Sequence, residues 1–156
     1  MERGILDLHN VLRWIILILL LISIITAFSG WQRAKVFTAA DKRIWLFTLI
    51  SAHINFLVGL YLLFLGKFGI LTTDLPEGTS LMKNRSLRFY WVEHPLMMLL
   101  SIILITVGYG MAKKPVADKV KFRKAFWFFL IALILILASI PWPGLADIGR
   151  PLFPGK

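Results

Sequence analysis

The chain has 156 residues, of which 58% are hydrophobic and 17% charged, and its mean hydropathy is +0.78. Soluble domains have a hydrophobic share of about 45–50%, so the excess apolar surface is expected to face lipid. Cysteine is absent, which excludes disulfides, thiolate metal sites and cysteine nucleophiles. The formal net charge is +10, but most basic residues lie between apolar runs, which favours a role in membrane topology and predicts no nucleic-acid partner.

Four apolar stretches come close to the length of about 20 residues that a membrane-spanning helix needs. They cover residues 12–31, 44–66, 89–112 and 125–141. The connections are short, so consecutive helices are expected to be antiparallel neighbours. The sequence therefore predicts an all-α fold, a single transmembrane domain over residues 1–156 that forms an integral membrane four-helix up-down bundle in the lipid bilayer. The segment 142–156, rich in proline and glycine, is predicted to be an extended tail.

The distribution of basic residues predicts the orientation of the bundle. Ten of the 18 Lys and Arg residues lie in two short connections, between the first and second spans and between the third and fourth. The other eight are spread over the N-terminal region, the connection from Lys67 to Arg88 and the C-terminal tail. Because cytoplasmic loops are enriched in Lys and Arg, both termini are expected on the non-cytoplasmic side.

The chain has three histidines, and each belongs to a different one of the first three predicted helices: His9, His53 and His94. A ligand-type side chain in a membrane helix is a functional candidate by default. The alternative is a histidine that hydrogen-bonds between helices or lies at the interface. The first and third helices run in the same direction, so His9 and His94 are expected near the same outer boundary of the hydrocarbon, and His53 nearer mid-membrane.

His9 and His94 face each other if the first and third helices lie diagonally across the bundle. Two neutral imidazoles on opposite sides of a flat macrocycle then serve as the metal ligands of a haem b. Arg13 follows His9 by one turn on the same face. Its guanidinium is expected either to pair with a haem propionate or to reach lipid phosphate. Pro95 removes a backbone donor next to His94, so the third helix is expected to kink or begin there.

Other polar and small residues near the histidines have less specific interpretations. Ser101 and Gly108, at seven-residue steps along the third helix, leave room for a ligand or for close helix packing. Glu93 is expected to pair with Arg85 or Arg88, and proton transfer to a quinone is the alternative.

On the second helix, Asn55 lies about 200° around the helix axis from His53, so one pocket is not expected to use both residues. We assign Asn55, with Ala52 and Gly59, to a stripe that packs against a neighbouring helix.

Two other metals are weaker alternatives to haem iron. Met97 and Met98 follow His94, and thioether and imidazole ligands suit copper, but methionine in an apolar helix usually serves packing. A zinc site built from three imidazoles needs all three histidines at one depth, which their places in the helices disfavour. The sequence has no Walker A loop, dinucleotide fingerprint or HExxH motif.

With these histidines, the chain resembles the membrane-anchor b-type cytochromes of succinate dehydrogenases and fumarate reductases. In the dihaem members, histidines recur one helix and one loop apart on four successive helices, and those on the first and third can hold one haem. His9, His53 and His94 match the first three places, whereas the fourth predicted helix, 125–141, has no histidine. The resemblance implies one haem b, and it leaves a second haem, bound through His53, with an incomplete ligand pair.

The chain also resembles small bacterial four-helix membrane proteins described as cytochrome b-like, and this resemblance covers most of its length. It rests on three segments: His9-x-x-x-Arg13-Trp14, Ala52-His53 and Glu93-His94-Pro95. The resemblance implies a multi-pass protein of the bacterial inner (cytoplasmic) membrane.

Two functions from different classes follow. The first is a membrane b-type cytochrome that binds haem between His9 and His94 and transfers electrons, to or from a quinone or a partner redox subunit. The second is a redox-inert accessory subunit that packs in a larger membrane complex, with its histidines as interhelical or interfacial polar groups. The same ligands serve a quinone-linked oxidoreductase and an electron-transfer subunit, so the sequence leaves that choice open.

Overall fold

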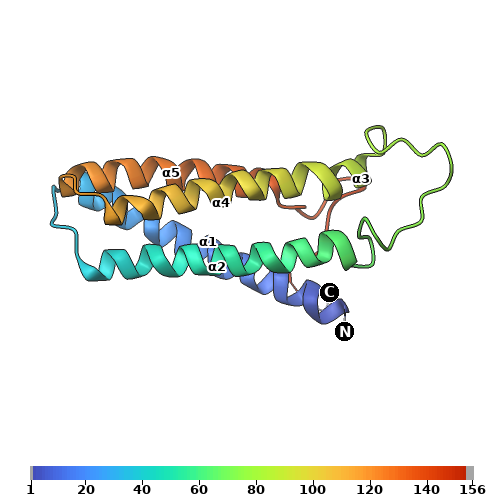
Figure 1. The fold of residues 1–156 in the computed structure, drawn as a ribbon, viewed down its shortest axis with the longest axis horizontal. Helices are drawn as coiled ribbons and strands as arrows, with labels where there is room; N and C mark the ends of the chain where they lie inside the picture. Colours follow the sequence, from blue (N-terminus) through green and yellow to red (C-terminus); the bar gives the residue numbers. More distant parts are fainter. Residues whose placement is uncertain (1, 154–156) are drawn as a thin grey trace.

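The computed structural model describes residues 2–153, and this part of the chain contains helices, turns and loops but no strand (Figure 1). The helices are α1 Glu2–Gln32, α2 Ala39–Leu65, α3 Arg85–Arg88, α4 His94–Gly110 and α5 Asp118–Ser139. A π-helical turn, Phe89–Glu93, joins α3 to α4, and a 3-10 turn, Met111–Lys113, follows α4. The helix is therefore continuous from Arg85 to Lys113, and the described residues hold four helices that are long and apolar enough to cross a membrane.

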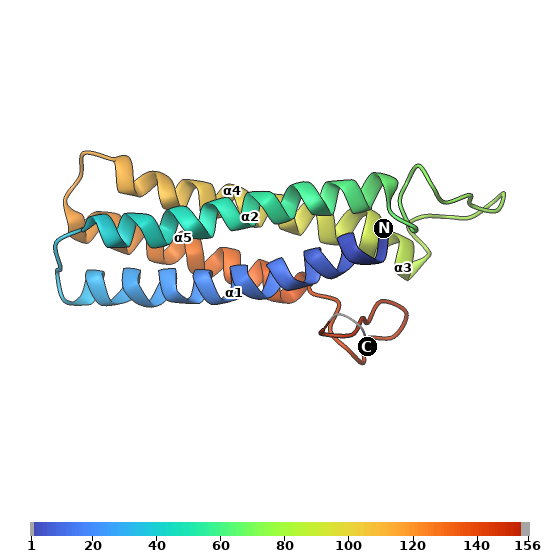
Figure 2. The ribbon, with the colours of Figure 1, turned by 90° about the horizontal axis from the view of Figure 1, so that it is seen from below.

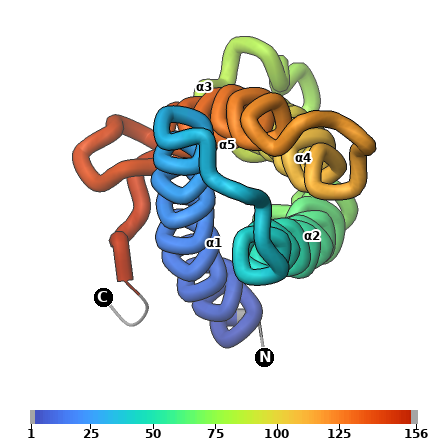
Figure 3. The backbone as a smooth tube through the Cα atoms, turned by 90° about the vertical axis from the view of Figure 1, so that its left-hand side faces the viewer, coloured from blue at the N-terminus to red at the C-terminus, as the bar shows by residue number. Residues whose placement is uncertain are grey.

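The four long helices form the predicted up-down bundle. Successive helices run in opposite directions along the bundle axis (Figure 1, Figure 2). α1 packs against α2 and α5, and α4 packs against the same two helices. Viewed along the axis, the order around the bundle is α1, α2, α4, α5 (Figure 3). The all-α fold class is confirmed, and α1 lies diagonally across the bundle from α4.

The helices extend beyond the apolar stretches from which they were predicted. α1 begins at Glu2 rather than at residue 12, and α5 begins at Asp118 rather than at residue 125. A helix satisfies its backbone hydrogen bonds internally in water as in lipid, so the loss of apolar side chains does not end it. α2 begins where Thr38 forms a capping box with Asp41, a local signal that supplies partners to unpaired amides at the helix start.

The outer surface of the bundle is apolar on all four long helices. Large hydrophobic side chains that are about half exposed include Ile18 and Ile25 on α1, Leu57 on α2, Ile103 on α4 and Ile134 on α5. In water such a surface would be a liability, whereas hydrocarbon solvates it without cost. The exposed residues are thus those expected of a multi-pass protein in contact with lipid.

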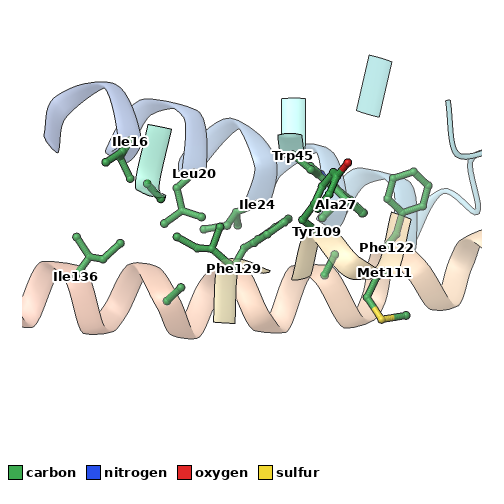
Figure 4. Close-up of a cluster of buried hydrophobic side chains, with 14 of the residues drawn as sticks. Ile16, Leu20, Ile24, Ala27, Trp45, Tyr109, Met111, Phe122, Phe129 and Ile136 are labelled. Atoms are coloured by element: carbon green, nitrogen blue, oxygen red, sulfur yellow. The ribbon is translucent and has the colours of Figure 1, made fainter. Parts of the chain in front are cut away.

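A cluster of buried aromatic side chains lies toward the end of the bundle that carries the α1–α2 and α4–α5 connections (Figure 4). Trp45 at the start of α2 meets Phe122 and Phe129 of α5 edge-to-face, with ring centres 5.9 and 5.4 Å apart. Beside them Ser23 and Thr48, both fully buried, share a hydrogen bond of 2.8 Å between α1 and α2. Large rings and paired hydroxyls therefore make up much of the core in this half of the bundle.

The C-terminal segment is more structured than the predicted extended tail. It has turns at Pro143–Gly144 and Ala146–Ile148, and it lies beside the first half of α1 (Figure 2). The backbone amide of Arg150 donates to the carbonyl of Pro141 at 3.0 Å, which closes the segment into a loop. Prolines and glycines permit such turns as readily as an extended chain. Residues 154–156 of the predicted tail lie outside the described part of the structure.

Candidate functional site

The half of the bundle opposite the aromatic core encloses a cavity of about 560 Å³. Its volume falls within the usual range for small-molecule sites, about 300–1,000 Å³. Ile16, Ile105 and Ile136 belong both to its lining and to the hydrophobic core, so they separate the cavity from the packed half. Beyond them the lining includes small residues such as Gly59 and Ser101 together with aromatic residues such as Phe56 and Tyr90.

His9 of α1 and His94 of α4 both line this cavity, and the structure brings them together across the diagonal of the bundle. Their ring centres are 6.3 Å apart, with an angle of 72° between the ring planes. A metal–imidazole bond is about 2.0–2.1 Å long, so two imidazoles on opposite sides of one metal ion have ring centres roughly 6 Å apart. The separation of His9 and His94 fits that requirement.

A backbone carbonyl at the end of α5 orients His94. Nδ1 of His94 lies 2.8 Å from the carbonyl oxygen of Ser139, the last residue of α5. A carbonyl accepts hydrogen bonds only, so Nδ1 carries the proton and Nε2 keeps its lone pair. The carbonyls in the last turn of a helix lack intrahelical partners, which makes this one available. Metal-binding histidines are typically held in this manner, with one ring nitrogen donating and the other free to ligate.

Pro95 places His94 on the helix by widening the turn before it. Proline has no amide hydrogen, and its ring crowds the carbonyl four residues earlier, that of Trp91. The turn Phe89–Glu93 is π-helical, and the amide of His94 donates to the carbonyl of Phe89, five residues back. The expected kink or helix start at Pro95 is therefore realised as a π turn inside a continuous helix. Such turns change which residues share a helix face.

His9 sits against a glycine of α2. A Cβ atom added to Gly59 would lie 3.2 Å from Cε1 of His9, which is closer than a comfortable van der Waals contact. Nδ1 of His9 is buried and has no hydrogen-bond partner among the described residues, and the same holds for Oδ1 of Asn55. Buried polar atoms without a partner are unusual in a folded protein, and with Nε of Arg13 three of them belong to residues that line this one cavity, which favours a ligand or water there.

Asn55 lies on the inner face of α2, where the sequence predicts a helix-packing stripe with Ala52 and Gly59. Ala52 belongs to the hydrophobic core, Asn55 is 9% exposed, and Gly59 lies against His9 of α1. All three also line the cavity, which the sequence did not predict. Small residues on a helix face favour close packing and ligand space equally. Only the place of α2 in the bundle decides between the two. The available signal was that Asn55 lies on the face opposite His53.

Arg13 also lines the cavity, and it is held by the C-terminal segment. Its Nη2 donates to the carbonyl of Leu152 at 2.7 Å, and Nε1 of Trp14 donates to the same oxygen at 3.1 Å. The ring of Trp14 stacks on Phe153, with ring centres 5.6 Å apart and an interplanar angle of 11°. Arg13 is 9% exposed, so in the structure it faces the bundle interior rather than reaching outward to lipid.

His53 is not part of this site. Its side chain is exposed on the outer face of α2, and its Nδ1 lies 2.8 Å from the carbonyl of Leu49. It lies six residues, or roughly 9 Å of helix axis, from Gly59, which contacts His9. The other two histidines, His9 and His94, face each other instead. The structure thus separates His53 from His9 and His94.

The structure also places the other residues that the sequence singled out on the third predicted helix. Nε of Arg88 donates to Oε1 of Glu93 at 2.7 Å, the ion pair that the sequence favoured. A Cβ at Gly108 would lie 2.6 Å from the ring of Phe129, so Gly108 serves helix packing, whereas Ser101 lines the cavity. Of the two adjacent methionines only Met98 lines the cavity.

Among residues 2–153 no group of three or more His, Asp or Glu side chains is arranged to hold a metal ion. Comparisons of the chain with known protein families, with characterised proteins and with solved structures found no match.

Proposed function

We propose that the chain is a small membrane b-type cytochrome that holds one haem b between His9 and His94 and exchanges electrons with a quinone or a partner redox subunit. The observation that carries the proposal is the 6.3 Å separation of the two imidazole centres inside a 560 Å³ cavity. Bound haem supplies a one-electron iron couple there.

Three properties of the cavity support haem as the ligand. First, the two histidines come from diagonally opposed helices, which leaves a gap that a flat macrocycle can fill. Second, the bond from His94 to the Ser139 carbonyl fixes the tautomer that ligation requires. Third, the lining is mainly apolar with a few polar groups, the composition usual for cofactor sites. Arg13 adds a buried cation suited to a carboxylate of the ligand.

The protein's part in electron transfer would be to set the reduction potential. Ligation by two neutral imidazoles, burial in an apolar cavity and the positive charge of Arg13 are the means available to it. The two termini lie at the same end of the bundle as the cavity (Figure 1). We place this end on the non-cytoplasmic side of a bacterial inner membrane, because the two short connections with most of the basic residues lie at the other end.

The test is a reduced-minus-oxidised visible spectrum of the purified full chain, with a pyridine haemochrome assay for stoichiometry. We expect one haem b per chain in the wild type. His9→Ala and His94→Ala should each abolish the low-spin α-band, because each removes one axial ligand. His53→Ala is the matched control and should retain the band, because its ring lies outside the cavity.

A wild-type chain that binds no haem after expression with ample haem supply would contradict the proposal. That result would favour the alternative function, a redox-inert accessory subunit of a larger membrane complex. Two haems per chain would show that His53 has a ligand partner beyond those described.

A further inference from the structure

The cavity carries an excess of positive charge. A single acidic residue, Asp7, contributes to its lining. Four basic residues contribute to it: Arg3, Arg13, Lys67 and Arg150. In the described part of the chain the ion pairs are Arg88–Glu93 and Lys121–Asp118, and neither contributes to the lining. Within the described residues, the basic side chains of the cavity thus form no ion pair with a carboxylate, which favours a ligand that brings its own negative charge.

Arg13 is the buried member of this set. The residue is 9% exposed, its Nε has no hydrogen-bond partner among the described residues, and its one bond from Nη2 goes to the neutral carbonyl of Leu152. A buried cation is costly unless it is paired. A carboxylate accepts two parallel hydrogen bonds from a guanidinium, and it would satisfy both the charge and the free Nε.

Arg150 approaches the cavity from the C-terminal segment. Its Nε donates to the hydroxyl oxygen of Tyr90 at 2.9 Å, and its guanidinium lies over the rings of Tyr90 and Phe68 at 5.2 and 5.5 Å. Tyr90 in turn donates to the carbonyl of Ile148. These contacts hold Arg150 in place through Nε and the ring faces, and the structure records no protein partner for its two terminal nitrogens within residues 2–153.

We propose that Arg150 is the second cation of a carboxylate-binding subsite whose first cation is Arg13, and that this subsite selects an apolar ligand carrying two carboxylates over its uncharged counterpart. The inference rests on the proposed function, for which the ligand is haem b with its two propionates. It goes further by giving the C-terminal segment a binding role. Leu152 fixes Arg13, and the same segment carries Arg150 to the rim of the cavity.

The experiment compares two porphyrin ligands that differ only in charge. The full-length apo-protein in a neutral detergent is titrated with haem b and with its dimethyl ester, and the dissociation constants are read from the Soret absorbance. Because hydrogen bonds between a guanidinium and a carboxylate are charge-assisted, the wild type should bind the diacid at least about tenfold more tightly than the ester. Arg150→Gln should lose most of that preference and leave binding of the ester unchanged.

Arg85→Gln is the matched control, because Arg85 is exposed and lies outside the cavity lining. The α-band should stay in place in Arg150→Gln, since both histidine ligands remain, and a variant that merely misfolds would lose the band. Equal affinity of the wild type for diacid and ester, or a preference retained in Arg150→Gln, would overturn the subsite while leaving the cytochrome proposal intact. Failure of the wild type to bind either porphyrin would instead overturn both.

A lipid phosphate is the other anion that could meet these guanidinium groups. To separate the two sources, the titration is repeated in micelles doped with phosphatidylglycerol. If the subsite serves the ligand, the doped lipid leaves the diacid preference of the wild type unchanged. If lipid phosphate occupies it, the doped lipid removes that preference in the wild type and changes nothing in Arg150→Gln, and the carboxylate assignment is wrong.

Discussion

The site depends most directly on single residues that are small or that leave one polar atom free. Gly59 lets the ring of His9 approach α2, since a Cβ there would lie 3.2 Å from Cε1. Ser139 accepts the hydrogen bond from His94 with its backbone carbonyl and not with its hydroxyl. The side chain of Ser139 therefore does not orient the ring of His94. The position of the His9 ring thus depends on the missing side chain of Gly59, and the orientation of the His94 ring depends on the backbone carbonyl of Ser139.

Gly59→Val should therefore disturb the site without unfolding the helix. The added methyl groups meet the ring of His9, and we expect the affinity for haem to fall at least about tenfold, which corresponds to a loss of about 1.4 kcal/mol or more of binding free energy. The measurement is the Soret titration in detergent. Gly110→Val is the control, because a Cβ at Gly110 meets nothing within 4 Å. Equal affinities of the two variants would show that His9 does not need the space.

At the scale of elements, the helix from Arg85 to Lys113 combines three helical geometries. The π turn Phe89–Glu93 directly precedes His94, and Pro95 explains its presence through the missing amide hydrogen and the crowded carbonyl of Trp91. The π turn contains one residue more than an α-helical turn, which rotates the residues before it around the helix axis relative to those after it. The two groups of residues therefore face different neighbours. Trp91 thus donates to the carbonyl of Phe68 at 2.7 Å while His94 points into the cavity lining.

Pro95→Ala tests this account. An amide at position 95 restores the donor to the carbonyl of Trp91, and the turn is expected to return to α-helical geometry, which rotates Phe89–Glu93 relative to His94 by up to about 100°. We expect helical content by circular dichroism to stay constant and haem affinity to fall severalfold. Pro115→Ala, in the exposed connection between α4 and α5, should change neither. Unaltered haem binding in Pro95→Ala would mean that the π turn has another cause.

At the scale of the whole molecule, the bundle has two halves along its axis: a packed half at one end and a half with the cavity, the hollow half, at the other. Aromatic rings fill the space near the two short connections (Figure 4), whereas the end with both termini holds the cavity, the histidines and the folded-back tail (Figure 1). Contacts in the packed half determine the relative arrangement of the four helices. The hollow half can then keep unfilled space, a feature that is usually destabilising by itself.

This division predicts that stability and ligand binding separate. Phe129 is fully buried, and Phe129→Ala should lower the free energy of unfolding by about 3–5 kcal/mol through lost contacts and a new cavity. Haem affinity below the unfolding transition should change little, because Phe129 does not contribute to the lining. Thermal unfolding in detergent and the Soret titration measure the two quantities.

Phe47→Ala is the control for this variant, because Phe47 is 56% exposed on the outer face of α2 and its loss should leave stability nearly unchanged. A large loss of haem affinity in Phe129→Ala under folding conditions would show instead that the two halves are coupled.

The sequence by itself determined the number, type and order of the helices. Long apolar runs in lipid must be helical, because no water is available to satisfy backbone groups, and short connections make neighbours antiparallel. It also indicated that His9 and His94 lie at the same depth, because the first and third helices of an up-down bundle run in the same direction. Such inferences need only local composition and the rise of a helix.

Only the tertiary structure decided which side chains meet. The order α1, α2, α4, α5 around the bundle places His9 opposite His94, turns His53 outward and makes the inner face of α2 at Asn55 part of the cavity lining. The proline-rich tail likewise brings Leu152 to Arg13 and Arg150 to the cavity lining. The physical reason is that small and polar residues on a helix face are compatible with several neighbours, so the packing of all four helices together selects one.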